Sequence, residues 1–114
     1  MSEQIYKPTN LSECFEQLDK IFSESPDADD WKVEDERKAI ASSHHGLGQW
    51  IRNNWELWKE ESTLHQHFEK LGLHHADDMS GVILTSYHRH LNNKDLGLDE
   101  QINHYIDFWK KGEK

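Results

Sequence analysis

The stretch HGLGQWIRNNWELW, residues 45–58, has the pattern that decides the fold class of this chain. Its large apolar residues recur at intervals of three and four, which places them on one side of an α-helix. The predicted helix runs roughly from His45 to Trp58, and its stripe consists of Leu47, Trp50, Ile51, Asn54, Trp55 and Trp58. Because each tryptophan buries a large area, we expect this helix to be central to the core.

Two glycines near the start of this helix indicate a close neighbour. Gly46 and Gly48 each cost about 1 kcal/mol relative to alanine in a helix. We therefore expect a backbone segment or a large ring to approach them closely.

Working outward, other segments show the same helical period. Such helices are predicted over residues 11–22, 64–71, 76–92 and 98–111, and an acidic loop over residues 23–30. Residues 33–41 contain good helix formers but few apolar residues, which predicts a short surface helix. No strand pattern of useful length and no interior linker is visible. The sequence therefore predicts an all-α fold, in which residues 1–114 form a single compact domain of five or six helices.

The charge balance limits the choice of partners. The chain has 13 Lys and Arg against 22 Asp and Glu, a net charge of −9. Residues 1–40 hold 11 of these acids against 5 bases, so the excess lies mainly in the first third. A negative field repels phosphate backbones and anionic lipid, so neither nucleic acid nor a membrane is an expected partner.

Other features of composition point to the cytoplasm. No stretch approaches the roughly 20 apolar residues that cross a bilayer, and Met1 to Tyr6 lacks the pattern of a signal peptide. The lone Cys14 cannot form an internal disulfide and lies on an apolar stripe, so we expect a small buried hydrophobe.

Nine histidines raise the question of a metal site, but their spacing argues against a simple one. Most occur in pairs one or two residues apart, which point away from each other on a helix, and no pair forms the i, i+4 clamp. A site would combine one of His44 and His45 with one of His74 and His75 and with Asp77 or Asp78. We predict no metal, no cofactor and no catalytic residue, since the familiar enzyme motifs are also absent.

Arg52 lies among the tryptophans of the central helix, and two interpretations of it stay open. In the structural one, Arg52 pairs with Asp77 or Asp78 at the start of a later helix. In the functional one, Trp50, Arg52, Asn53 and Trp55 line a binding surface, since Trp and Arg most often dominate binding energy.

At these residues the chain resembles a small bacterial family of unknown function. The likeness rests on His45-Gly-Leu-Gly-Gln-Trp-Ile-Arg-Asn-Asn-Trp55 and on Asp77-Asp78-Met-Ser80, and it covers residues 7–92. His75 stands where the family often has proline, which leaves the start of that helix less defined. The resemblance implies a compact helical domain and no particular reaction.

Small size, acidity and the lack of catalytic motifs favour an acidic protein-binding module. More specifically, we expect a bacterial immunity-type protein that neutralises a basic toxin, with Asp29, Asp30, Glu34 and Asp35 in its docking face. The alternatives are a metal-assisted hydrolase built on Arg52, His45 and the Asp77/Asp78 pair, or a non-catalytic regulatory or scaffold subunit. The oligomeric state stays open.

Overall fold

The structure is a computed structural model that describes residues 7–112 of the chain. The prediction that the N-terminus lacks a signal peptide concerns residues 1–6, which lie outside the described residues. The described part folds into helices without strands: α1 (Leu11–Ser23), α2 (Ala28–Val33), α3 (Glu36–Ser43), α4 (Leu47–Asn54), α5 (Thr63–Leu71), α6 (Ala76–Leu91) and α7 (Leu98–Gly112). The all-α fold class is confirmed, but these are seven helices rather than the expected five or six.

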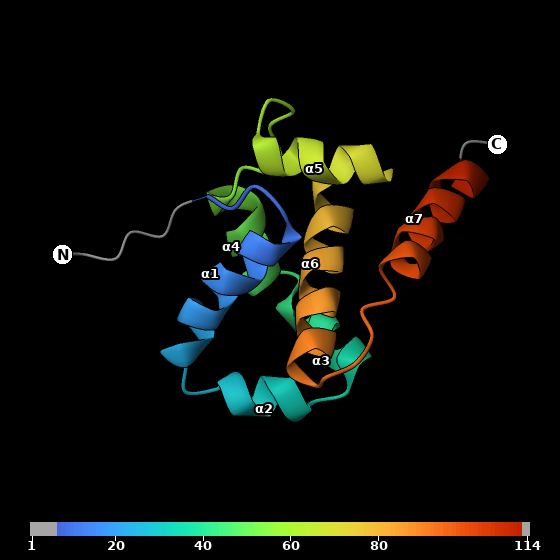
Figure 1. Ribbon diagram of the computed structural model, residues 1–114. Helices are drawn as coiled ribbons and strands as arrows, with labels where there is room; N and C mark the ends of the chain where they lie inside the picture. The colour runs from blue at the N-terminus through green and yellow to red at the C-terminus, as the bar shows by residue number, and fades with distance from the viewer. Residues whose placement is uncertain (1–6, 113–114) are drawn as a thin grey trace.

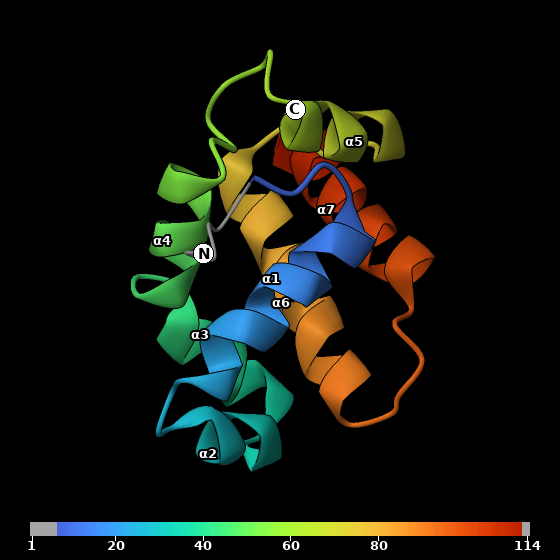
Figure 2. The same ribbon diagram turned by 60° about the vertical axis from the view of Figure 1, so that its left-hand side comes forward.

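Helix α6 is the centre of the molecule. It runs between α1 and α4 on one side and α7 on the other, while α5 crosses one end and α2 lies at the opposite end (Figures 1 and 2). Asp77 and Asp78 lie in its first turn, where negative charge favours the helix dipole. Nine of its side chains are buried, because neighbouring helices cover it from several directions.

The core forms where α1, α4, α5 and α7 meet α6. Ile51, Trp55, Val82 and Ile83 are each at most 1% exposed and are buried together, whereas Trp50 is half-buried against them. Cys14 is fully buried in the same cluster, as expected, and burial raises the pKa of its thiol. Within residues 7–112, no helix has both the length and the apolar character needed to cross a membrane.

Helix α4 is shorter than the predicted helix over residues 45–58. It ends at Asn54 because Glu56 takes a left-handed conformation with φ of 56°, and the Leu57 amide then donates to the Arg52 carbonyl. This arrangement is the Schellman motif, usually built with glycine at the left-handed position. The chain therefore leaves the helical stripe before Trp58, whose side chain is exposed rather than buried.

The first half of helix α2 lies within the loop predicted over residues 23–30. None of its six residues is buried, so it has no apolar stripe by which a period could be recognised. The helix expected over residues 33–41 is also displaced, because α2 ends at Val33 and α3 begins only at Glu36. Asp35 accepts a hydrogen bond from the Lys38 amide at 3.4 Å and so caps α3.

Candidate functional site

Arg52 joins three segments of the chain beneath the surface. Its Nη1 donates to Ser80 Oγ on α6 at 2.9 Å, and its Nη2 donates to the His44 carbonyl at the end of α3 at 2.9 Å. Its Nε lies 3.3 Å from Asp77 Oδ1, an ion pair without the alignment of a hydrogen bond. The predicted pairing of Arg52 with Asp77 or Asp78 is confirmed for Asp77.

Gly48 makes room for this arginine. A Cβ atom at residue 48 would lie 3.1 Å from Arg52 Nη1 and 3.1 Å from the Ser43 carbonyl oxygen. The expected close approach is therefore present at Gly48, while a Cβ at Gly46 would meet nothing within 4 Å. The absence of a side chain at Gly48 therefore leaves the space that the Arg52 guanidinium occupies.

The other residues of the predicted Trp/Arg binding surface are divided between core and surface. Trp55 is 1% exposed and Arg52 is 4% exposed, so neither offers its side chain to a large partner. Trp50 is half-buried, and Asn53 is exposed and accepts a hydrogen bond from the Trp58 indole. The contacts of Arg52 are those of a residue that ties α4 to α6, which is the structural interpretation of this cluster.

The acidic residues predicted for docking lie together on α2 and the start of α3. We call Asp29, Asp30, Glu34 and Asp35 the acidic corner; all four are exposed, and none forms an ion pair within residues 7–112. The backbone runs directly from α2 to α3 through Glu34 and Asp35, so the four carboxylates project from one short stretch of chain.

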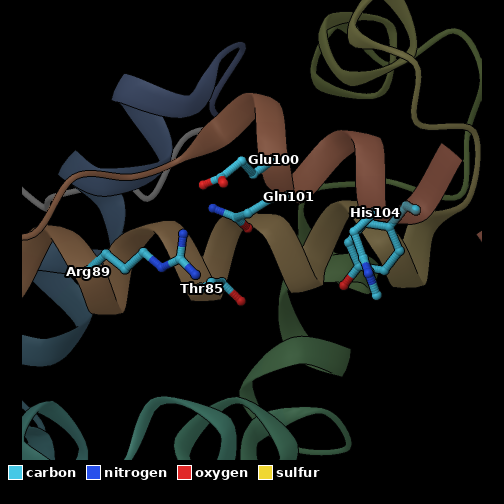
Figure 3. Close-up of a pocket in the computed structure, with 6 residues that line it drawn as sticks. Thr85, Arg89, Glu100, Gln101 and His104 are labelled. Carbon is cyan, nitrogen blue, oxygen red and sulfur yellow. The ribbon is translucent and has the colours of Figure 1, made fainter. Parts of the chain in front are cut away.

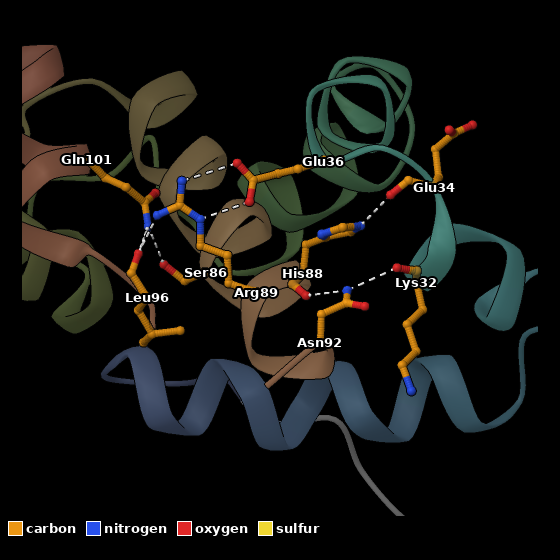
Figure 4. A network of polar contacts seen from close by, with 9 residues as sticks. All are labelled: Lys32, Glu34, Glu36, Ser86, His88, Arg89, Asn92, Leu96 and Gln101. Atoms are coloured by element: carbon orange, nitrogen blue, oxygen red, sulfur yellow. Dashed lines mark hydrogen bonds and ion pairs between the residues drawn. The ribbon is translucent and has the colours of Figure 1, made fainter. Parts of the chain in front are cut away.

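Polar side chains of α6 attach this corner to the rest of the protein (Figure 4). His88 Nε2 lies 3.0 Å from the Glu34 carbonyl, and Asn92 Nδ2 donates to the Lys32 carbonyl at 3.0 Å. Because a carbonyl oxygen only accepts hydrogen bonds, the buried His88 must carry a proton on Nε2. These bonds use backbone carbonyls and leave the Asp29 and Asp30 carboxylates exposed to solvent, whereas Asp35 caps α3 and Glu34 accepts a hydrogen bond from the Asp35 amide.

A third attachment is the ion pair between Arg89 and Glu36. Arg89 Nε and Nη2 donate to the two Glu36 oxygens at 2.8 and 3.1 Å, and Nη1 donates to the Leu96 carbonyl at 2.6 Å. This hydrogen bonding from Arg89 lowers the pKa of Glu36. Sequence reasoning missed the α6 attachments, because a histidine, arginine and asparagine near a helix end do not reveal distant carbonyl partners.

The histidines do not gather into a metal centre. Among the described residues, no group of three or more His, Cys, Asp or Glu side chains is placed to hold a metal ion. Asp78 accepts a hydrogen bond from the Trp109 indole at 2.7 Å, and His75 stacks on the same ring at 4.0 Å. The combination of two histidines and an aspartate considered from the sequence is therefore not assembled.

A polar pocket of about 390 Å³ lies between α6 and α7 (Figure 3). Thr85 and Arg89 on α6 face Glu100, Gln101 and His104 on α7. The Arg89 guanidinium is already neutralised by Glu36, and Gln101 Nε2 donates to Ser86 Oγ and the Leu96 carbonyl. Arg89 and Gln101 are thus bonded to residues outside the pocket lining, and the bond from Gln101 to Ser86 joins α7 to α6.

The fold and these contacts define a small all-helical domain with a buried arginine junction and an exposed acidic corner. The chain belongs to DUF6794, a domain of unknown function whose family model matches residues 7–91. This agrees with the expected membership of a family of unknown function, and the match ends with α6, before α7. No curated protein and no solved structure matches the chain.

Proposed function

We propose that the protein is an acidic protein-binding module that recognises a basic protein through the acidic corner. The observation that carries the proposal is that α2 has no buried residue and yet is bonded to α6 at its C-terminal carbonyls. Apart from Trp31, which is half-buried against the core, the residues of α2 contribute little to core packing. Its acidic side chains are instead presented in a fixed arrangement, which reduces the ordering cost of binding.

Electrostatics favours a cationic partner. A net charge of −9 attracts such a protein over several ångströms and speeds their encounter, and unpaired carboxylates at the contact then set its orientation. More specifically, we propose an immunity-type protein whose carboxylates cover the cationic substrate site of a toxin. In a bacterial genome, the gene for such a toxin would lie beside the gene for this chain.

The test uses the purified product of the adjacent gene and measures its association rate by stopped-flow fluorescence at about 50 and 300 mM salt. In one variant, Asp29, Asp30, Glu34 and Asp35 are replaced by lysine. In a control with the same change of net charge, Glu60, Glu61, Asp95 and Asp107 are replaced by lysine; all four are exposed and have no ion pair within the described residues.

We expect the acidic-corner variant to associate at least about tenfold more slowly at low salt. The association rate of the control should fall much less. Thermal unfolding of the control should stay close to that of the parent, since surface substitutions usually change stability by about 0.5 kcal/mol or less. The acidic-corner variant also loses the Asp35 cap of α3 and should be destabilised by about 1 kcal/mol. If both variants associate equally slowly, the effect comes from the overall charge, and the proposal that the acidic corner is the docking face is wrong. Unchanged association in both would overturn the proposed function.

A further inference from the structure

A mainly apolar pocket lies directly beside the acidic corner, where α1, α2, α3 and α4 converge. Its volume is about 220 Å³, and it is lined by Ile21, Phe22, Ser25, Asp27, Ala28, Trp31, Ser43 and Leu47. Pockets for drug-sized molecules are larger, about 300–1,000 Å³. The dimensions therefore suit one long side chain rather than a cofactor.

The aromatic wall of this pocket is fixed before any ligand binds. The Trp31 indole Nε1 donates to Ser43 Oγ at 2.8 Å and to the Ala39 carbonyl at 3.3 Å. Phe22 packs edge-on against the same indole, with ring centroids 5.1 Å apart. Two rings held in this way form a preorganised surface for an apolar or cationic group.

One carboxylate stands among the apolar lining residues. Asp27 precedes α2 at its N-cap position, but its side chain makes no capping hydrogen bond, and it has no ion pair within residues 7–112. It is exposed and lines the same pocket as the Trp31 ring. An aspartate at an N-cap ordinarily bonds to the helix amides. Here the carboxylate is available to a ligand.

We propose that this pocket receives an arginine side chain of the basic partner. The methylene stem would lie against Ile21 and Leu47, the guanidinium would pair with Asp27, and the rings of Phe22 and Trp31 would contact its face. Arginine fits better than lysine, because its planar cation stacks on aromatic rings and pairs with carboxylates through two hydrogen bonds. The inference rests on the proposed function, since it names the anchor residue of the same partner.

The first experiment needs no partner. The arginine side-chain analogue n-butylguanidinium is titrated into ¹⁵N-labelled protein while the indole signals of Trp31 and Trp58 are followed by NMR. We expect a saturable shift of the Trp31 signal at millimolar concentrations, which is the affinity scale of such small ligands. The exposed Trp58 indole serves as an internal control and should stay in place.

Substitutions then test the assigned contacts. Asp27→Asn should lower the affinity for n-butylguanidinium about fivefold or more, because it removes the charged partner of the guanidinium. The double control Asp29→Asn/Asp30→Asn should change this affinity less than about twofold. Ala28→Leu places a larger side chain at the pocket lining and should abolish the Trp31 shift. Unchanged thermal unfolding confirms that each variant is folded, and Asp27→Asn tests the pocket even where Ala28→Leu fails to fold.

Other probes decide the chemistry of the occupant. If 1-pentanol shifts the Trp31 signal with equal affinity, the pocket selects apolar groups and the proposal is wrong. Equal binding of n-butylammonium would overturn the choice of arginine. A titration without any Trp31 shift would remove the pocket as a site altogether.

The product of the adjacent gene separates this inference from the proposed function. We expect Ala28→Leu to weaken that complex at least about tenfold, mainly through faster dissociation, while the salt dependence of association is retained. If reversal of the acidic corner slows association but Ala28→Leu leaves the affinity of the complex unchanged, the proposed function stands and the arginine pocket is refuted. If the reversal is silent while n-butylguanidinium still binds at Trp31, the pocket stands and the docking face fails.

Discussion

Gln17 on α1 is a buried amide that the core does not satisfy. Its side chain is fully buried, and neither Oε1 nor Nε2 has a hydrogen-bond partner among the described residues. A buried polar group without a partner costs about 1–3 kcal/mol, whereas methionine has a similar length and no such requirement. We expect Gln17→Met to raise the free energy of unfolding in urea by about 1 kcal/mol.

The matched control is Gln49→Met, because Gln49 is exposed on α4. That substitution should change the free energy of unfolding by no more than about 0.5 kcal/mol. A loss of stability in Gln17→Met would show that the amide of Gln17 is satisfied by a buried water.

Between elements, the Arg52 junction should contribute more through its neutral acceptors than through its ion pair. Asp77 is 59% exposed, so its carboxylate returns to water when the arginine is removed. Ser80 Oγ, which is buried, and the half-buried His44 carbonyl instead lose a charged donor. We expect Arg52→Ala to lower the free energy of unfolding by about 3 kcal/mol, and Asp77→Asn by about 1 kcal/mol or less.

Chemical denaturation of the two variants measures this difference directly. Equal losses would mean that the ion pair dominates the junction. Arg52→Lys should be nearly as damaging as Arg52→Ala, since an ammonium group cannot reach both acceptors in the geometry of the planar guanidinium.

The pairing of α3 with α6 through Glu36 and Arg89 should make stability depend on pH. The pKa of Glu36 is lower in the folded protein than its ordinary value of 4.5, so folded Glu36 gives up its proton more readily. Its contribution is complete above the unfolded pKa and is lost as pH falls through the folded pKa. The stability difference between parent and Glu36→Gln should therefore be largest near pH 7 and shrink steadily below about pH 4.5.

Unfolding curves at pH 7, 5 and 3 give this comparison. Glu61→Gln is the control, because Glu61 is exposed and has no ion pair within the described residues. A constant difference for Glu36→Gln across the range would contradict the role of Arg89.

Helices with an apolar stripe could be predicted from their period, whereas α3 was predicted with displaced bounds and α2 was missed. The segments of α1, α5, α6 and α7 bury one side each, so their period is visible. Helix α2 has no fully buried residue, and its position depends on Trp31 and on carbonyl bonds to His88 and Asn92, which are distant in sequence. The early end of α4 depends on the left-handed conformation of Glu56, which is uncommon for a glutamate and could not be predicted from the residue type.

For the site, the sequence predicted that Arg52 pairs with Asp77 or Asp78, but neither which of the two nor which tryptophans reach the surface. Asp77 could be foreseen because a buried arginine needs a carboxylate and α6 begins with two. The exposure of Trp58 and the burial of Trp55 depend on where α4 ends, which the helical period alone does not fix. The pocket beside Asp27 combines four elements and was not visible at all.

Across the whole molecule, protection against hydrogen exchange should follow distance from α6. Amides in α6 have nine buried side chains around them and should exchange only on global unfolding, whereas amides in α2 should exchange through local opening. Mass spectrometry of peptides from the two helices measures both rates. Comparable protection of α2 and α6 would show that the carbonyl bonds from α6 stabilise α2 as strongly as burial stabilises a core helix.

The central place of α6 has a consequence for synthesis on the ribosome. Helices α1, α3, α4 and α5 all pack on α6, which follows them in the chain. The nascent chain therefore emerges with core aromatic residues such as Trp31, Trp55 and Phe68 before the surface that covers them exists. Since domains fold as units during translation, the growing polypeptide should depend on chaperones until residue 91 has left the exit tunnel, and then fold in one late step.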